Sequence, residues 1–276
     1  MKYIVAALLG LVASQAFGAE TILLEKKNTV SLREEFTQSS VDTVKQALIA
    51  LDHTLPSNEF INLYLNTPGG DVVAGNSLND VIKGLKHKVN VIVEFAASMG
   101  YITTQATTGK RYITNSGVLM AHRAYVGVQG QTPGEVNVRL AFYEDMTNRL
   151  AAMAASRTGV TTQQYQNKVV KEYWVEGDAA IKDKQADEVV NVQCAANLKG
   201  TSGETIYTFF GPIEVEWDNC PLISSPVSIN IPRNELGYSE LEYQNFNRSV
   251  QDMLTKSKFD IVDDKSLIDN YHRYVR

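Results

Sequence analysis

The stretch VNVIVEFAASMGYITTQ, residues 89–105, has the pattern of a buried strand that passes directly into a helix. Its first seven residues form a largely apolar run, which is typical of a strand inside a sheet. Ser98 falls at the junction, between two alanines and a Met-Gly pair. A small residue that fills a tight turn and a nucleophile that faces a substrate both fit this position.

Strand-like and helix-like patterns alternate on both sides of this stretch. Strands are expected at residues 29–32, 60–65, 89–95, 112–113 and 118–120. Helices are expected at residues 39–51 and 74–85, from about Ser98 onward, and from about Pro133 to Arg157. Because the connections between them are short, the alternation predicts an α/β fold around a largely parallel sheet.

The composition is that of a globular chain with a sizeable core, since 44% of the 276 residues are apolar and 21% are charged. The net charge of −5 is mild and no Lys/Arg cluster stands out, which argues against a nucleic-acid surface. No Cys-x-x-Cys or His-x-x-x-His spacing occurs, so we expect no metal site and no other cofactor.

Residues 1–19 have the pattern of a secretory signal peptide. A basic start at Lys2 is followed by an apolar stretch and then by small and polar residues, with cleavage expected after Gly18 or Ala19. An anchoring helix is the alternative, but a span needs about 20 apolar residues. We therefore expect a periplasmic or secreted protein, with no other apolar run long enough to cross a membrane.

Export bears on the two cysteines of the chain, Cys194 and Cys220. An even pair in an oxidising compartment favours a disulfide, so we predict a bond between them. Two buried free thiols are the alternative.

The pattern changes near residue 199. A turn-rich break leads into two β-type runs at 205–210 and 213–217, a proline-bearing segment, and a helical pattern from about Ser239. We therefore divide the chain into a signal peptide (1–19), a main domain (20–198) and a C-terminal extension (199–276). The extension is small for independent folding, so we expect it to pack on the main domain or to depend on the disulfide.

Three features converge on Ser98. Backbone N–H groups at a helix N-terminus have no intrahelical partner, and such groups can stabilise an oxyanion. Pro68-Gly69-Gly70 lies at another strand-to-helix junction and can offer a further N–H. His122 follows the strand at 118–120 and can take the hydroxyl proton. Each feature alone is commonly structural, and their joint spacing favours a nucleophile.

Five segments resemble successive motifs of the Clp protease proteolytic subunit family, in order and with near-family spacing within residues 28–193. They are residues 66–72, 96–100, 109–112, 115–116 and 120–123. The resemblance implies the Clp/crotonase fold, a spiral of repeated β-β-α units with a long handle helix. It also implies a serine peptidase with Ser98 as nucleophile, His122 as general base, and the N–H groups of Gly70 and Met99 as oxyanion donors.

The third member of the family's Ser-His-Asp triad is where this sequence departs from the pattern. When Trp174 is aligned with the family's aromatic residue, Glu172 falls at the acid position. A glutamate orients the histidine in some hydrolases, although its extra methylene requires a different backbone distance. Asp178 is the second candidate, and in a third interpretation neither acid reaches His122.

The resemblance extends to assembly and energy use. The segment 125–159 resembles the family's handle, a Gly- and Gln-containing strand followed by a long helix that joins rings of subunits, so we expect a closed homo-oligomer. An apolar core face is the alternative for the same helix. A periplasm holds no ATP and the chain has no phosphate-loop motif. We therefore expect an ATP-independent serine endopeptidase that cleaves peptides or unfolded proteins.

Three other functions stay open on the sequence. A catalytically inactive scaffold or binding module is favoured by Glu172 and the extension, and disfavoured by the presence of both Ser98 and His122. An acyl-CoA enzyme on the related crotonase fold would need a cofactor that is not expected outside the cytoplasm. A serine–lysine peptidase would use Lys110 or Lys171 as its base, which His122 makes unnecessary.

Overall fold

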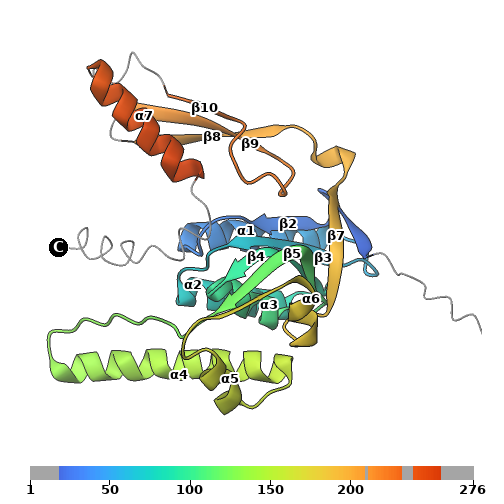
Figure 1. Cartoon of the computed structure of the whole chain (residues 1–276), viewed down its shortest axis with the longest axis vertical. Helices are drawn as coiled ribbons and strands as arrows, with labels where there is room; N and C mark the ends of the chain where they lie inside the picture. Colours follow the sequence, from blue (N-terminus) through green and yellow to red (C-terminus); the bar gives the residue numbers. More distant parts are fainter. Residues whose placement is uncertain (1–18, 209–210, 232–238, 256–276) are drawn as a thin grey trace, which may run out of the picture.

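The computed structural model describes residues 19–208, 211–231 and 239–255. Its centre is a seven-stranded sheet in which six strands follow the order β1-β7-β5-β4-β3-β2 (Figure 1). These six pair in parallel, and β6 joins β5 in the antiparallel sense. The predicted α/β fold around a mainly parallel sheet is confirmed.

The strands of this sheet are β1 (Glu20–Leu24), β2 (Thr29–Leu32), β3 (Ile61–Thr67), β4 (Val89–Ala97), β5 (Arg111–Ala121), β6 (Tyr173–Glu176) and β7 (Glu188–Cys194). The helices of the main domain are α1 (Gln38–Thr54), α2 (Val72–Gly84), α3 (Met99–Ala106), α4 (Pro133–Thr158), α5 (Thr162–Lys168) and α6 (Gly177–Lys182), followed by a 3₁₀ turn at Ala196–Leu198. The extension contributes β8 (Thr201–Thr208), β9 (Gly211–Asp218), β10 (Ser228–Asn230) and α7 (Glu240–Thr255).

The two short strands expected at 112–113 and 118–120 are parts of one strand, β5. Its pairing with β4 shifts register between Val93 and Phe95, so that Val93 faces Ile113 and Phe95 faces Val118. Gly117 lies at this irregularity, and a Cβ there would meet the Val93 carbonyl oxygen at 2.6 Å. The two predicted segments are therefore the portions of β5 that pair with β4 on either side of the shift.

The main core lies between the sheet and the helices packed on one of its faces. Alternate residues of β3, such as Leu63 and Leu65, join Val44 of α1, Leu78 of α2 and Tyr101 of α3 in one buried cluster. Only the C-terminal half of α4 contributes to it, through residues such as Ala154. This packing brings the N-termini of α2 and α3 to the carboxyl ends of β3 and β4, where the sequence places Gly70 and Ser98.

The opposite face of the sheet is covered by the end of the main domain at Leu198 and by a segment of the extension, the connection between β9 and β10. Tyr64 of β3 and Ile92 of β4 are buried there together with Leu198, and Leu222 packs against them. The predicted disulfide is present between Cys194 and Cys220, with the Cα atoms 5.8 Å apart. It fixes the start of this covering segment to the end of β7.

The extension forms a second, three-stranded antiparallel sheet with α7 packed beside it (Figure 1). Its own apolar cluster centres on Ile213, Val215, Ile231 and Val250. Hydrogen bonds tie the connection between β9 and β10 to the main domain: Arg33 donates to the Ile223 carbonyl, and the Asn66 amide donates to the Ser224 hydroxyl, both at 2.8 Å. The extension therefore has a core of its own, and the proposed boundary at residue 199 stays a prediction.

The segment expected as the handle strand has a different conformation. Residues 122–131 carry no assigned strand and run beside the N-terminal half of α4 (Figure 1). A strand requires a neighbour with which to exchange backbone hydrogen bonds, and the sheet pairings of this single chain give the segment none.

Three predictions fall partly outside the described residues. They are the signal peptide, of which only residue 19 is described, the end of the β-type run 205–210, at Phe209 and Phe210, and the C-terminal extension, of which residues 232–238 and 256–276 also lie outside. Within the described ranges, no helix combines the length and the apolar character that a membrane crossing requires.

Candidate active site

Ser98 occupies a sharp turn between the last residue of β4 and the first residue of α3. Its backbone lies at φ 53° and ψ −114°, a conformation that non-glycine residues rarely adopt. The Ser98 N–H donates to the Met120 carbonyl at 2.9 Å, which ties the turn to β5. Its side chain makes no capping bond to α3. A serine in a costly backbone conformation, with a hydroxyl that does not cap the helix, is typical of a functional site.

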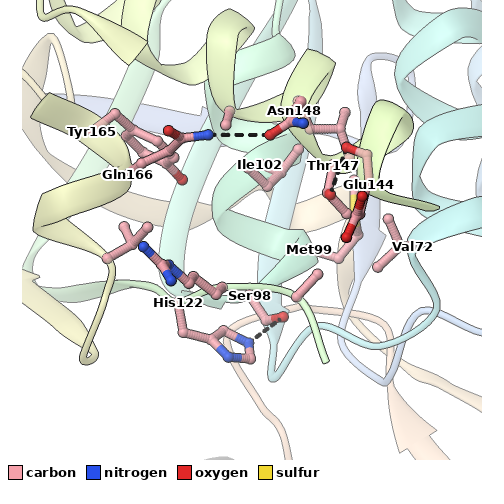
Figure 2. Close-up of a pocket in the computed structure, with 15 residues that line it drawn as sticks. Val72, Ser98, Met99, Ile102, His122, Glu144, Thr147, Asn148, Tyr165 and Gln166 are labelled. Carbon is pink, nitrogen blue, oxygen red and sulfur yellow. Dashed lines mark hydrogen bonds between the residues drawn. The ribbon is translucent and has the colours of Figure 1, made fainter. Parts of the chain in front are cut away.

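His122 lies beside this hydroxyl. It follows Ala121, the last residue of β5, and its Nε2 is 2.7 Å from the Ser98 Oγ (Figure 2). The two residues meet because β4 and β5 are parallel neighbours whose carboxyl ends share one edge of the sheet. For His122 to accept the hydroxyl proton, Nε2 must be unprotonated and the ring proton must be on Nδ1.

The surroundings of His122 favour its neutral form. Burial lowers the pKa of His122 below its ordinary value of 6.5, and the negative charge of Glu172 offsets this only in part. The Nδ1 atom is buried and has no hydrogen-bond partner within the described part of the chain. His122 is therefore suited to accept a proton from Ser98, but the second ring nitrogen lacks the acceptor that would orient the imidazole.

Glu172 lies next to His122 without bonding to it. In the antiparallel pair β5–β6, Ala121 faces Tyr173, so one further step of the register places Glu172 opposite His122. The Glu172 carboxylate accepts a hydrogen bond from the Trp174 indole Nε1 at 3.0 Å. The structure thus places Glu172 beside His122, with its carboxylate hydrogen-bonded to the Trp174 indole and not to the imidazole.

Asp178 lies beyond the far end of this ladder, in the first turn of α6. Glu176, two residues before it, faces Val118, which precedes His122 by four residues. At the rise of a β-strand, four residues span about 13 Å. The structure therefore does not bring Asp178 together with His122.

The glycine turn after β3 packs directly against Ser98. The Gly69 carbonyl accepts from the Phe36 N–H, and the Asp71 N–H donates to the Phe36 carbonyl, both at 2.7 Å. A Cβ built on Gly69 would lie 2.6 Å from the Ser98 Cβ and 2.9 Å from the Met99 nitrogen. Met99 is the first residue of α3, so its N–H has no acceptor within the helix. Gly69 thus packs against Ser98 and Met99, while the next residue, Gly70, packs against Phe36. The role of the Gly70 and Met99 N–H groups as oxyanion donors stays a prediction.

A pocket of about 510 Å³ opens beside Ser98 and His122 (Figure 2). Its apolar lining comes from α2, α3, α4 and the end of α5, and includes Val72, Met99, Ile102, Leu150 and Val169. Its polar lining includes Glu144, Thr147 and Asn148 of α4, Gln166 of α5, and Arg123, which follows His122. The size and the mixed lining suit one substrate side chain and the adjoining backbone.

Sequence reasoning did not find the pocket residues of α4 and α5. The periodicity of α4 marks an apolar face but does not show that its middle turns wall a cavity next to Ser98. The Glu172–Trp174 bond was also missed, since it depends on the side-chain conformations of two residues that are two positions apart in the chain. Within the described residues, no cluster of three or more His, Cys, Asp or Glu side chains is placed to hold a metal ion.

A serine at a strand-to-helix turn, a histidine within hydrogen-bond distance and an adjoining pocket are the arrangement of a serine hydrolase site. Comparison with known proteins agrees. The chain belongs to the Clp protease family, whose model matches residues 14–193. It is also similar to the ATP-dependent Clp protease proteolytic subunit 2 of Tropheryma whipplei (strain Twist), with 28% identity over 168 residues, which is 60% of this chain and 92% of that relative. The family assignment makes this chain a peptidase-family member, and the whole extension (199–276) lies outside the match to the family model.

Proposed function

We propose that this chain is an exported, ATP-independent serine endopeptidase that cleaves peptides or unfolded proteins. The observation that carries the proposal is the 2.7 Å contact between the Ser98 Oγ and the His122 Nε2, at a serine held in a rare backbone conformation. An inactive scaffold has no need of a serine in this backbone conformation, because the conformation costs stability.

The proposed reaction uses Ser98 and His122 in sequence. His122 takes the hydroxyl proton as the Ser98 Oγ attacks a peptide carbonyl, and the negative oxygen of the tetrahedral intermediate turns toward the Gly70 and Met99 N–H groups. His122 then protonates the leaving amine, which leaves an acyl group on Ser98. A water molecule, deprotonated by His122, releases the acyl group and restores the hydroxyl.

Three observations support export and ATP independence. The signal-type sequence at 1–19 directs a chain out of the cytoplasm and into a compartment that is not supplied with ATP. The Cys194–Cys220 disulfide is the kind of bond that persists in oxidising compartments. The chain also has no phosphate-loop motif of its own. We therefore propose hydrolysis of substrates that are already unfolded or short.

Assembly into a homo-oligomer is proposed from the handle. In the N-terminal half of α4, Val138 is 72% exposed and Phe142 is 56% exposed, while Tyr125 on the adjoining segment is 70% exposed. Large apolar side chains grouped on one projecting element are typical of a contact surface. A second copy of this chain would cover them and would give residues 122–131 a strand neighbour.

The proposed function predicts covalent labelling at one serine. A fluorophosphonate probe should modify Ser98 in the mature protein without added nucleotide or partner, because the probe reacts with serines activated by a base. Mass spectrometry of the labelled peptide locates the adduct. Ser98→Ala should remove labelling, whereas Ser116→Ala, which changes an exposed serine on β5, should retain it. A folded protein that stays unlabelled would overturn the proposal.

The pocket predicts a preference at the substrate residue that precedes the scissile bond. Burial of a large apolar side chain against Ile102 and Leu150 is worth about 1.5–3 kcal/mol, so leucine or phenylalanine substrates should exceed aspartate substrates in kcat/KM by about 10–100-fold. Assays of peptides that differ only at this position measure the ratio. Glu144→Gln removes a negative charge from the lining and should narrow the ratio, while it leaves the leucine peptide within about twofold. An equal rate for all peptides would contradict this assignment of the pocket.

A further inference from the structure

Glu172, Trp174 and His122 form a three-membered group on one face of the β5–β6 ladder. Met120 faces Trp174 and Ala121 faces Tyr173, so Glu172 is the next cross-strand neighbour, opposite His122. Residues two apart on a strand share a face, and diagonal neighbours across a ladder remain within reach of long side chains. The Glu172 carboxylate therefore has two N–H donors nearby, the Trp174 indole and the His122 Nδ1.

The structure shows which donor the carboxylate takes. Glu172 Oε2 accepts from the Trp174 Nε1 at 3.0 Å, while the His122 Nδ1 is buried without a partner in the described residues. Trp174 is held in place by the Phe95 ring, with centroids 6.4 Å apart. A buried N–H without an acceptor is costly. In the present arrangement the more exposed Trp174 indole N–H has its acceptor, while the buried His122 Nδ1–H has none among the described residues.

We propose that Trp174 is a positioning residue that holds the Glu172 carboxylate away from His122 in the resting enzyme. This inference rests on the proposed peptidase function for its effect on rate. During attack by Ser98 the imidazole becomes positively charged, and the carboxylate then gains more from the Nδ1–H of His122 than from the neutral indole. Because of Trp174, the Glu172 carboxylate bonds to His122 only after the imidazole has become positively charged, and this delay lowers the rate of each turnover.

The other groups around His122 are not placed to replace Glu172 as the acceptor for its Nδ1–H. Arg123 follows it in the chain and lines the pocket, Glu144 lines the pocket from α4, and the Tyr125 ring lies 5.2 Å from the imidazole. The Ser98 hydroxyl already occupies Nε2. Among these, Glu172 is the acidic group whose charge raises the pKa of His122 against the effect of burial.

The test is Trp174→Phe, which keeps an aromatic ring near Phe95 and removes the indole N–H by replacing the two-ring indole with a single ring. With Glu172 released, kcat/KM for a peptide should rise about 2–10-fold, the change expected from the loss of one competing hydrogen bond. The gain should vanish in a Glu172→Gln background. Trp217→Phe, which changes the other tryptophan and lies in the extension, should leave the rate unchanged.

A second measurement does not depend on turnover. The titration of His122 can be followed by ¹⁵N NMR of histidine-labelled, sedimented protein, with His122→Gln as the assignment control. Trp174→Phe should raise the titration midpoint of His122, because the carboxylate then faces the imidazolium. An unchanged or lower midpoint would overturn the inference. A raised midpoint in a protein that hydrolyses no peptide would retain the inference and reject the proposed function instead.

Discussion

Replacing His122 with alanine is expected to reduce kcat/KM for peptide hydrolysis by about 10³-fold or more, since the serine hydroxyl then has no base within reach. Nε2 is the atom that faces Ser98 Oγ at 2.7 Å, and no residue in the described part of the site duplicates it. Ser98→Ala should lower kcat/KM to the same residual value. The double variant should be no less active than either single variant, because the two side chains act as one unit.

The comparison between the single and double variants is the control for this prediction. Steady-state assays on folded, assembled protein measure all three, with His53→Ala as a matched change of a histidine in the last turn of α1. Independent, additive losses at Ser98 and His122 would contradict a shared catalytic role. A serine–lysine mechanism would instead leave His122→Ala active and make Lys110→Ala or Lys171→Ala inactive.

The pH profile of the unmodified protein belongs to the same prediction. His122 must be neutral to act as a base, and burial lowers its pKa below 6.5. A lowered pKa keeps the imidazole neutral to a lower pH, so the acidic limb of kcat/KM should have its midpoint below pH 6.5. A midpoint above that value would mean that Glu172 already pairs with the imidazolium before substrate arrives.

The fold could be predicted from sequence because its central strands are buried on both sides. The apolar runs of β3 and β4 have few polar interruptions, and the helices between them carry apolar residues at helical spacing. The position of Ser98 followed from the same pattern, since a strand that runs directly into a helix leaves its junction residue at the sheet edge. Local chemistry was therefore enough to bring Ser98, His122 and the Gly69-Gly70 turn to one place.

What the sequence could not supply depends on contacts between distant segments. The register shift in β5 arises where Gly117 approaches the Val93 carbonyl; the sequence indicated a break there but not that both segments belong to one strand. The acid position was predicted as Glu172 from its spacing to an aromatic residue, but the spacing does not reveal that this aromatic carries the N–H that the carboxylate accepts. Side-chain competition of this kind is decided in three dimensions.

Gly69→Ala is expected to lower both the stability of the protein and its activity. An alanine at φ +95° is strained, and its Cβ would lie 2.6 Å from the Ser98 Cβ and 2.7 Å from the Ala97 carbonyl oxygen. Backbone strain and overlap together should reduce the free energy of unfolding by about 2–5 kcal/mol. Displacement of Ser98 and Met99 should reduce kcat/KM by about 10²–10³-fold.

Gly84→Ala is the matched control, because nothing lies within 4 Å of a Cβ at this position and Gly84 ends α2 in a helical conformation. It should raise the free energy of unfolding by up to about 1 kcal/mol and leave hydrolysis unchanged. Chemical denaturation and peptide assays on both variants separate the two effects. If Gly69→Ala kept full activity, Ser98 would not depend on the glycine turn, and the oxyanion role of Gly70 would have to be abandoned with it.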